Sequence, residues 1–470
     1  MDKIEQFADA AFTLEHFRRQ PPRTLESNAY LERQSERESS ARSYPRRIPL
    51  ALVEAHGLYV RDSQGQFFMD CLGGAGTLAL GHNHPVTVAA MRQTLDSGLP
   101  LHTLDLTTPV KEAFVDELFD CLPPAFARQA RVQFCGPTGA DAIEAALKLA
   151  KIATGRKGVF TFSGGYHGMT QGALSLMGNL GPKNLPGSLM ADVQVLPYPY
   201  DYRCPFGLGG EAGIDAGLSH IEHLLTDPES GVLPPAALVV EVVQGEGGVI
   251  PAPARWLQGL RRLTREYGIV LVIDEVQTGF GRTGDLFAFE SAGIEPDVLV
   301  LSKALGGGLP LSVIVYRDEF DGWKPGAHAG TFRGNQMAMA AGTATLRYLR
   351  SQGVAAHARL MGERLMAHLR ELQGQFSCIG QVRGRGLMIG VEIVAASSNN
   401  PRTPAGDGAM ARAIQQQCLR EGVILELGGR HGAVVRFLPP LIIQPGEIDL
   451  LAEKFERALV SALALPNTSG

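Results

Sequence analysis

Residues 268–280 read GIVLVIDEVQTGF, and residues 296–308 read PDVLVLSKALGGG. Each stretch contains a short apolar, branched run that ends in a charged residue, Asp274 in the first and Lys303 in the second. Short continuous apolar runs of this kind are typical of buried strands in a parallel sheet. Because ligands collect at the carboxyl ends of such strands, we expect both side chains to face one binding site.

The lysine at the end of the second run needs a chemical reason, because lysine is almost never fully buried without a partner. An amine in an apolar pocket loses its proton readily, and the neutral amine attacks carbonyl groups. Pyridoxal phosphate carries such a carbonyl and also needs an acidic partner for its pyridine nitrogen. Asp274, 29 residues before Lys303, supplies that acid, although a buried acid held by loop amides is the alternative. The pair predicts a pyridoxal phosphate site with Lys303 and Asp274 as catalytic residues.

Composition excludes several other classes of protein. With 470 residues the chain exceeds one ordinary core, and its net charge of −5 gives no case for nucleic acid or an acidic membrane surface. The six cysteines lack the C-x-x-C spacing of metal or redox sites, so we expect no metal and free thiols. No apolar stretch reaches the ~18 residues of a membrane span, and the N-terminus does not resemble a signal peptide. We therefore expect a cytoplasmic protein.

The pattern of strands and helices changes along the chain. In the middle, short apolar strands alternate with helical patterns, which predicts an α/β fold with a mostly parallel central sheet flanked by helices. Both ends instead suggest a smaller α+β domain, including a hairpin at residues 58–70 and a long C-terminal helix. The expected parts are an N-terminal arm at 1–45, the small domain at 46–105 and 346–465, and a large cofactor-binding domain at 106–345. The arm is expected to be a solvated arm or helix, and a role in subunit contact is the alternative.

A helix start suited to a phosphate is predicted at Thr138-Gly139-Ala140, where a helical apolar pattern begins. Backbone N–H groups and the helix dipole favour an anion at such a position. Thr138 followed by Asp141 also resembles a capping box, so an ordinary helix cap is the alternative.

Other residues complete the predicted cofactor site. Val276 is expected to pack against the ring, and Gln277 to reach its phenolic oxygen. Tyr166 is expected to cover the opposite ring face, whereas its neighbour His167 is expected to be a hydrogen-bonded structural histidine.

Two charged residues are candidates for substrate binding. Arg436 lies in an apolar run, VVRFLPPL at residues 434–441, where its guanidinium can bind a carboxylate bidentately. Glu246 lies in the turn-like segment QGEGG, and a solvated acid is its alternative.

Taken together, these segments resemble the class III (ω-amino acid) aminotransferases of fold type I, over roughly residues 45–465. The resemblance implies a seven-stranded central sheet, bound pyridoxal phosphate, and a homodimer in which Thr331 of the neighbouring subunit binds the cofactor phosphate. It also implies that Arg436 binds the α-carboxylate of glutamate, and that Glu246 pairs with Arg436 when a terminal amine reacts. The resembling motifs are TGA at 138–140, YHG at 166–168, QGEG at 244–247, DEVQTG at 274–279, SKA at 302–304 and RF at 436–437.

Within this family, residues 71–85, 136–139 and 330–335 resemble the diaminobutyrate–2-oxoglutarate aminotransferases. That branch moves the terminal amino group between L-2,4-diaminobutanoate and 2-oxoglutarate, with aspartate 4-semialdehyde and L-glutamate on the other side. The arm resembles the members that supply diaminobutyrate for siderophore-type biosynthesis. The alternatives are ornithine or 4-aminobutyrate as donor, a pyridoxal phosphate aminomutase of the glutamate-semialdehyde type, and a ligand-sensing domain without activity.

Overall fold

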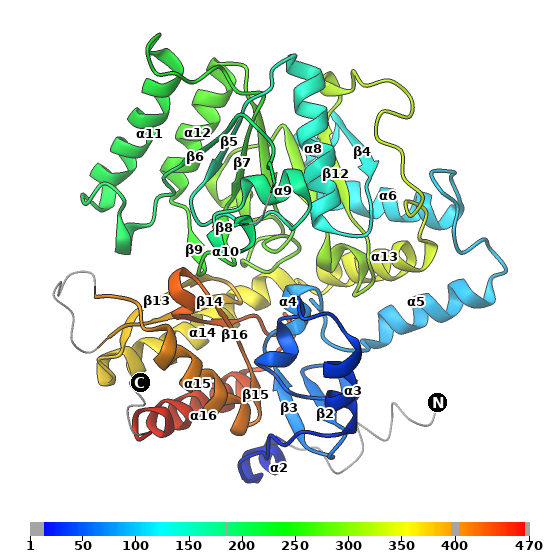
Figure 1. The fold of residues 1–470 in the computed structure, drawn as a ribbon. Helices are drawn as coiled ribbons and strands as arrows, with labels where there is room; N and C mark the ends of the chain where they lie inside the picture. Colours follow the sequence, from blue (N-terminus) through cyan, green and yellow to red (C-terminus); the bar gives the residue numbers. More distant parts are fainter. Residues whose placement is uncertain (1–13, 185–186, 396–403, 466–470) are drawn as a thin grey trace.

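A seven-stranded sheet forms the centre of the upper half of the molecule in Figure 1. In this computed structural model, which describes residues 14–184, 187–395 and 404–465, the strand order is β4-β12-β11-β10-β7-β5-β6. The pairs from β11 to β6 are parallel, whereas β12 runs antiparallel to both of its neighbours. The strands are β4 (Ala130–Phe134), β5 (Val159–Phe162), β6 (Val193–Leu196), β7 (Ala237–Glu241), β10 (Val270–Asp274), β11 (Val298–Leu301) and β12 (Val313–Arg317).

Both faces of this sheet are buried, as its continuous apolar strands predict. In β10, Val270 and Val272 join the hydrophobic cluster around α8 (Gly139–Thr154). The alternate residues Leu271 and Ile273 join the main core on the other face. Successive side chains of a strand point to opposite faces, so one apolar run supplies two cores.

Helices cover the sheet and connect it to the lower half of the molecule (Figure 1). α13 packs against α5 and α6, and α12 packs against α11. The bounds are α5 (Pro85–Asp96), α6 (Pro109–Cys121), α7 (Pro124–Ala127), α9 (Gln171–Leu176), α10 (Leu180–Lys183), α11 (Gly210–Thr226), α12 (Ala254–Glu266), α13 (Gln336–Ser351), α14 (Val354–Gln375), α15 (Gly408–Arg420) and α16 (Pro445–Leu463).

The lower half combines segments from both ends of the chain. One sheet has the order β1-β2-β3-β15, in which C-terminal β15 pairs in parallel with N-terminal β3, and another has the order β13-β14-β17-β16. A third pair, β8 (Val243–Gln244) and β9 (Ile250–Pro251), is antiparallel. The strands are β1 (Leu52–His56), β2 (Tyr59–Asp62), β3 (Phe67–Asp70), β13 (Ile379–Arg385), β14 (Met388–Ile393), β15 (Val423–Ile424), β16 (Glu426–Gly428) and β17 (Val434–Phe437).

The expected α/β class and the smaller α+β part built from both chain ends are therefore confirmed. The hairpin at residues 58–70 is also confirmed as the antiparallel pair β2 and β3. The N-terminal arm differs from the expected solvated arm or helix. In its described part, α2 (Leu14–Arg19) buries Phe17 completely, whereas α3 (Ala29–Arg37) buries no residue.

The segment after β11 also differs from the predicted strand end. The strand stops at Leu301, and Lys303 begins a 3-10 turn, η4 (Lys303–Gly306). The chain then reverses tightly at Gly307, whose φ is +58°. A Cβ atom there would lie 2.6 Å from the carbonyl oxygen of Ala341, so α13 approaches too closely for any larger residue.

None of the helices in the described ranges is long and apolar enough to cross a bilayer. The six cysteines are all free thiols.

Candidate active site

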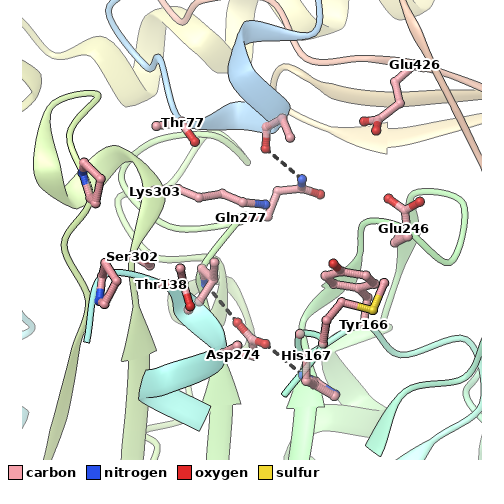
Figure 2. Close-up of a pocket in the computed structure, with 18 of the residues that line it drawn as sticks. Thr77, Thr138, Tyr166, His167, Glu246, Asp274, Gln277, Ser302, Lys303 and Glu426 are labelled. Carbon is pink, nitrogen blue, oxygen red and sulfur yellow. Dashed lines mark hydrogen bonds and ion pairs between the residues drawn. The ribbon is translucent and has the colours of Figure 1, made fainter. Parts of the chain in front are cut away.

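A cavity of about 870 Å³ opens at the carboxyl ends of β7, β10 and β11. Its wall also includes residues 43, 44, 47 and 48 of the N-terminal segment, Ala75 and Thr77 near α4 (Gly73–Gly76), and Glu426 of β16. Figure 2 shows Lys303 extending into this cavity, with Asp274 below it and Glu246 and Glu426 on the opposite side. Both halves of the fold therefore contribute to one site.

Asp274 is the last residue of β10 and is 5% exposed. Its Oδ2 accepts a hydrogen bond from His167 Nδ1 at 2.8 Å, and its Oδ1 accepts one from the backbone N–H of Val276 at 3.0 Å (Figure 2). Burial disfavours the charged imidazole, but the hydrogen bond and charge of Asp274 raise the pKa of His167. His167 thus fixes the orientation of the carboxylate, as expected for a hydrogen-bonded structural histidine.

Glu241 ends the neighbouring strand β7, and its Cα is paired in register with that of Asp274. Its carboxylate accepts hydrogen bonds from the backbone N–H groups of Tyr166 at 2.8 Å and Gly245 at 3.0 Å. Burial, together with the charge of Asp274, raises the pKa of Glu241 to about 7 despite the opposing charge of His167. Two carboxyl groups and one histidine therefore share the base of the cavity.

Lys303 lines the same cavity as these acids and has a left-handed backbone, with φ of +50°. This conformation costs a residue other than glycine roughly 1–3 kcal/mol, and such strain concentrates at functional sites. Within the described parts of the chain, no hydrogen bond or ion pair is recorded for its side chain. Burial and the positive charge of Arg436 lower the pKa of Lys303, and the charge of Asp274 acts in the opposite direction. More of the reactive neutral amine is therefore present near neutral pH.

The predicted phosphate-binding segment lies in the same cavity, where Thr138, Gly139 and Ala140 all form part of its wall. Thr138 is the N-cap of α8, and both its backbone N–H and its hydroxyl donate to Asp141 Oδ2, at 3.0 and 2.9 Å. The cap and the helix dipole thus coexist with the anion site predicted there. A Cβ atom at Gly139 would lie 2.9 Å from the methyl groups of Val276, so glycine is required for this close approach.

Val276, Gln277 and Tyr166 also line the cavity. Gln277 donates to the carbonyl oxygen of Ala75 at 3.0 Å and accepts from Arg436 Nη2 at 3.3 Å. A glutamine amide carries two N–H donors, so one remains for the ring oxygen that the sequence predicts as its partner. Tyr166 is 36% exposed and stands on the side of the cavity opposite Lys303 (Figure 2).

Arg436 of β17 is completely buried and is held by two carboxylates. Its Nη1 lies 2.5 Å from Glu246 Oε2 and 3.3 Å from Glu426 Oε2. Although burial disfavours the charged guanidinium, these two carboxylates raise the pKa of Arg436. The structure thus brings together Arg436 and Glu246, the pair that the family resemblance implies, and adds a second acid.

Thr331 is the one predicted cofactor residue that lies away from this cavity. Its side chain is exposed, and the residue is not part of the cavity wall of its own chain. A contribution from Thr331 to a site of this kind therefore requires a second copy of the chain.

The residues of the cavity wall that sequence reasoning missed include Glu241, Glu426 and Tyr44. Glu241 carries the same signal as Asp274, an acid that ends a buried apolar strand, and could have been found by it. Glu426 interrupts the apolar run from Val423 to Leu427, which is a weaker signal of the same type. Tyr44 carries no signal, because it reaches the cavity only through the path of the N-terminal segment.

The residues present fit pyridoxal phosphate. The cavity has room for it, a buried acid and a lysine with a lowered pKa stand at its base, and a helix N-terminus opens into it. In this arrangement Asp274 would face the ring nitrogen, Lys303 the reactive carbon, and the start of α8 the phosphate.

Comparison with known proteins gives a consistent result. The family model described as aminotransferase class-III matches residues 40–459. The chain is 55% identical over 434 residues to the diaminobutyrate–2-oxoglutarate aminotransferase of Rhizobium meliloti, an alignment that covers 91% of this chain and 92% of that relative. It is 52% identical over 436 residues to the protein of the same name from Haemophilus influenzae, covering 92% and 95% of the two chains.

Solved structures agree. An amine transaminase from an uncultivated Pseudomonas species, determined with bound pyridoxal phosphate, is similar with a TM-score of 0.80 and 29% sequence identity. The match covers 91% of this chain and 98% of that one.

Proposed function

The chain belongs to the class III aminotransferases, and we propose that it transfers the terminal amino group of L-2,4-diaminobutanoate to 2-oxoglutarate. Enzymes of this family use pyridoxal phosphate, which when bound supplies an electron-accepting ring for the carbon that loses its proton. The relatives from Rhizobium meliloti and Haemophilus influenzae bear the name of this reaction. The observation that carries the proposal is the Arg436–Glu246 pair, in which Glu246 lines the cavity that holds Lys303 and Arg436 lies buried behind it.

The pair supports a reaction with two chemically different donors. When glutamate reacts at its α-amine, its α-carboxylate needs a cation beside the reacting carbon, and Arg436 provides a bidentate partner. When a terminal amine reacts, no carboxylate is present there, and an unpaired buried guanidinium would be costly. Glu246 then neutralises Arg436, as it does at 2.5 Å in this structure.

The floor residues have proton-handling roles in this proposal. Lys303 removes the proton from the substrate carbon and returns it as general acid, which its lowered pKa favours. Asp274, oriented by His167, holds the proton on the ring nitrogen of the cofactor. Val276 and Tyr166 exclude water from the two faces of the ring.

Steady-state kinetics with a panel of donors tests the substrate assignment. L-2,4-diaminobutanoate, L-ornithine and 4-aminobutanoate are each supplied with 2-oxoglutarate, and both the semialdehyde and glutamate are measured. We expect kcat/KM for diaminobutanoate to exceed the others by at least about 10-fold, because ornithine is one methylene longer and 4-aminobutanoate lacks the α-amino group that a fitted site would bind. Equal values for the three donors would refute this specificity, and turnover without 2-oxoglutarate would indicate an aminomutase.

We also propose that the enzyme is a homodimer with shared active sites. Thr331 lies next to exposed apolar side chains, since Phe332 is 69% exposed and Leu106 is 68% exposed. The two segments are neighbours, because the backbone N–H of Thr103 donates to Gly334 at 3.2 Å. An apolar surface of this kind is typical of an interface.

Mixing two inactive variants tests the shared site. Lys303→Ala removes the lysine of a site, whereas Thr331→Glu places a repelling charge at the phosphate of the partner's site. If sites are shared, hybrid dimers contain one intact site, and a 1:1 mixture refolded together recovers about one quarter of wild-type activity. A mixture as inactive as its components, or a monomer by light scattering, would contradict the proposal.

Two further sequence predictions remain proposals for this chain. A cytoplasmic location is supported by six cysteines that are all free. A role in supplying diaminobutyrate for siderophore-type biosynthesis is supported by the resemblance of the N-terminal arm.

A further inference from the structure

Arg436, which is buried behind the cavity wall, is in direct contact with more than one negative charge. One guanidinium is flanked by two carboxylates, Glu246 at 2.5 Å and Glu426 at 3.3 Å. Glu246 alone neutralises the guanidinium through a direct hydrogen bond. A second carboxylate at the same atom adds repulsion from the first, and a further cation beside it in the cavity would offset that repulsion.

Glu426 is built into the fold more rigidly than Glu246. Its side chain is 9% exposed, against 40% for Glu246, and it lies on β16 rather than in a loop. The hydroxyl of Tyr44 donates to Glu426 Oε1 at 2.9 Å. Tyr44 comes from the short helix η1 (Tyr44–Arg46), so the N-terminal segment fixes the direction of this carboxylate.

The other oxygen of Glu426 lacks a hydrogen bond. Oε2 is buried without a hydrogen-bond partner among the described residues, because its contact with Arg436 is an ion pair at 3.3 Å. Glu426 lines the cavity that also contains Lys303 (Figure 2). An ionised carboxylate only accepts hydrogen bonds, so the missing partner is a donor, and a cationic donor would form the stronger, charge-assisted hydrogen bond.

We propose that Glu426, oriented by Tyr44, binds the α-ammonium group of a diamino acid while the terminal amine of the same molecule reacts at Lys303. This inference rests on the proposed function, because it presumes a donor with two amino groups. An ammonium carries three N–H donors and one positive charge. It therefore satisfies the free oxygen and balances the second carboxylate. Glu426 thus distinguishes diamino acids from donors that have only the terminal amine.

Two donors that differ only in this group provide the test. L-2,4-diaminobutanoate and 4-aminobutanoate share the terminal amine, the chain length and the carboxylate, but only the first has an α-ammonium. We expect Glu426→Gln, which keeps the shape and removes the charge, to lower the ratio of kcat/KM for these two donors by about 30- to 100-fold. The loss should appear mainly in KM for diaminobutanoate. General damage to the site cancels in the ratio.

Three further variants keep the result interpretable. Glu426→Asp retains the charge and should recover part of the ratio, and Tyr44→Phe should lower it by about 3- to 10-fold through loss of one hydrogen bond. Glu246→Gln is the matched control, since it removes the other carboxylate that contacts Arg436. It should lower kcat/KM for the two donors by similar factors. Calorimetric binding of the two donors to Lys303→Ala protein, with and without Glu426→Gln, measures the same preference without turnover.

The outcomes separate the two proposals. A wild-type preference for diaminobutanoate that survives Glu426→Gln and Tyr44→Phe overturns the role of Glu426 and leaves the proposed function standing. The same conclusion follows if Glu246→Gln, rather than Glu426→Gln, removes the preference. A wild-type enzyme that does not distinguish the two donors overturns both proposals.

Discussion

The floor of the cavity and the wall around Arg436 use different numbers of chain segments. The floor consists of Asp274, Glu241, His167 and Lys303, and three of these follow adjacent strands of one sheet. The wall consists of Arg436, Glu246, Glu426 and Tyr44, which come from β17, a loop, β16 and the N-terminal segment. The floor therefore depends on the register of one sheet, whereas the wall depends on four segments that meet only in the folded chain.

We expect this difference to separate the residues that take part in the reaction from the residues that select the substrate. In the proposed function the floor residues face the cofactor, so changes there should affect every donor and acceptor alike. Wall residues face the groups that differ between substrates, so changes there should affect one half-reaction more than the other. The following predictions test that separation, from the largest expected effect to the smallest.

Lys303→Ala should reduce turnover by about 10⁴-fold or more with all donors, because the residue that moves the proton is lost. The visible absorption band of the enzyme-bound cofactor should disappear as well. Both are measured on purified protein, with circular dichroism to confirm folding. Retention of either the band or the activity would contradict the assignment of Lys303 as the residue that binds the cofactor and moves the proton.

Asp274→Asn should reduce turnover by about 10²- to 10³-fold, because one electrostatic contact to the reacting group is lost. The cofactor should still bind, and both half-reactions should slow by comparable factors in single-turnover experiments. His167→Asn is the comparison variant, and its loss should be smaller because His167 acts through Asp274. A loss confined to one half-reaction would contradict the assignment of Asp274 to the floor.

Arg436→Lys should affect the two half-reactions unequally. Lysine keeps the positive charge but lacks the guanidinium fork, so kcat/KM for glutamate should fall by about 30- to 100-fold. Reaction with diaminobutanoate should change only a few-fold, since the lysine still offers a positive charge to Glu246 and the α-ammonium of the donor is still available to Glu426. Stopped-flow measurement of each half-reaction tests this expectation. Equal losses of rate in the two half-reactions would show that the wall residues do not distinguish glutamate from diaminobutanoate.

Glu241→Gln should change the dependence of stability on pH. Burial raises the pKa of Glu241 to about 7 from an ordinary value of 4.5, so the unfolded chain releases this proton at lower pH than the folded one. The free energy of unfolding of the wild type therefore falls as pH rises from 4.5 to 7, and the variant lacks this loss.

Relative to the wild type, Glu241→Gln should thus gain roughly 2–3 kcal/mol of stability between about pH 5 and pH 8. Urea unfolding of both proteins at the two pH values measures the difference. Glu275, whose pKa burial also raises to about 7, is present in both proteins and cancels. A difference that is constant with pH would mean that Glu241 ionises normally in the fold.

Much of the floor was predictable because its signals are local. An apolar run followed by one charged residue identified Asp274 and Lys303, and the same pattern at Glu241 was overlooked rather than absent. The helix after Thr138 also follows its pattern, since Ile143, Ala146 and Leu147 are buried. In α16, by contrast, the periodic Leu463 is 43% exposed, because the helix ends at that residue.

The wall was only partly predictable because its contacts are long-range. Arg436 stood out as a charge in an apolar run, and family resemblance supplied its pairing with Glu246. No local pattern indicated that Glu426 contacts the guanidinium of Arg436. Nor did any pattern indicate that Tyr44, 382 residues earlier in the chain, donates a hydrogen bond to Glu426. Such contacts depend on how β16, β17 and the N-terminal segment pack together.

The sequence by itself determined the class of fold and that Lys303 and Asp274 line one cavity, because strand periodicity and the geometry of parallel sheets bring strand ends together whatever the rest of the chain does. Tertiary structure alone decided that two carboxylates share Arg436 and that one of them keeps an oxygen free. The charge balance of a buried cluster depends on all the charged groups that lie close together in space. Here those groups come from segments that are far apart in the sequence, so their distances cannot be read from the order of the chain.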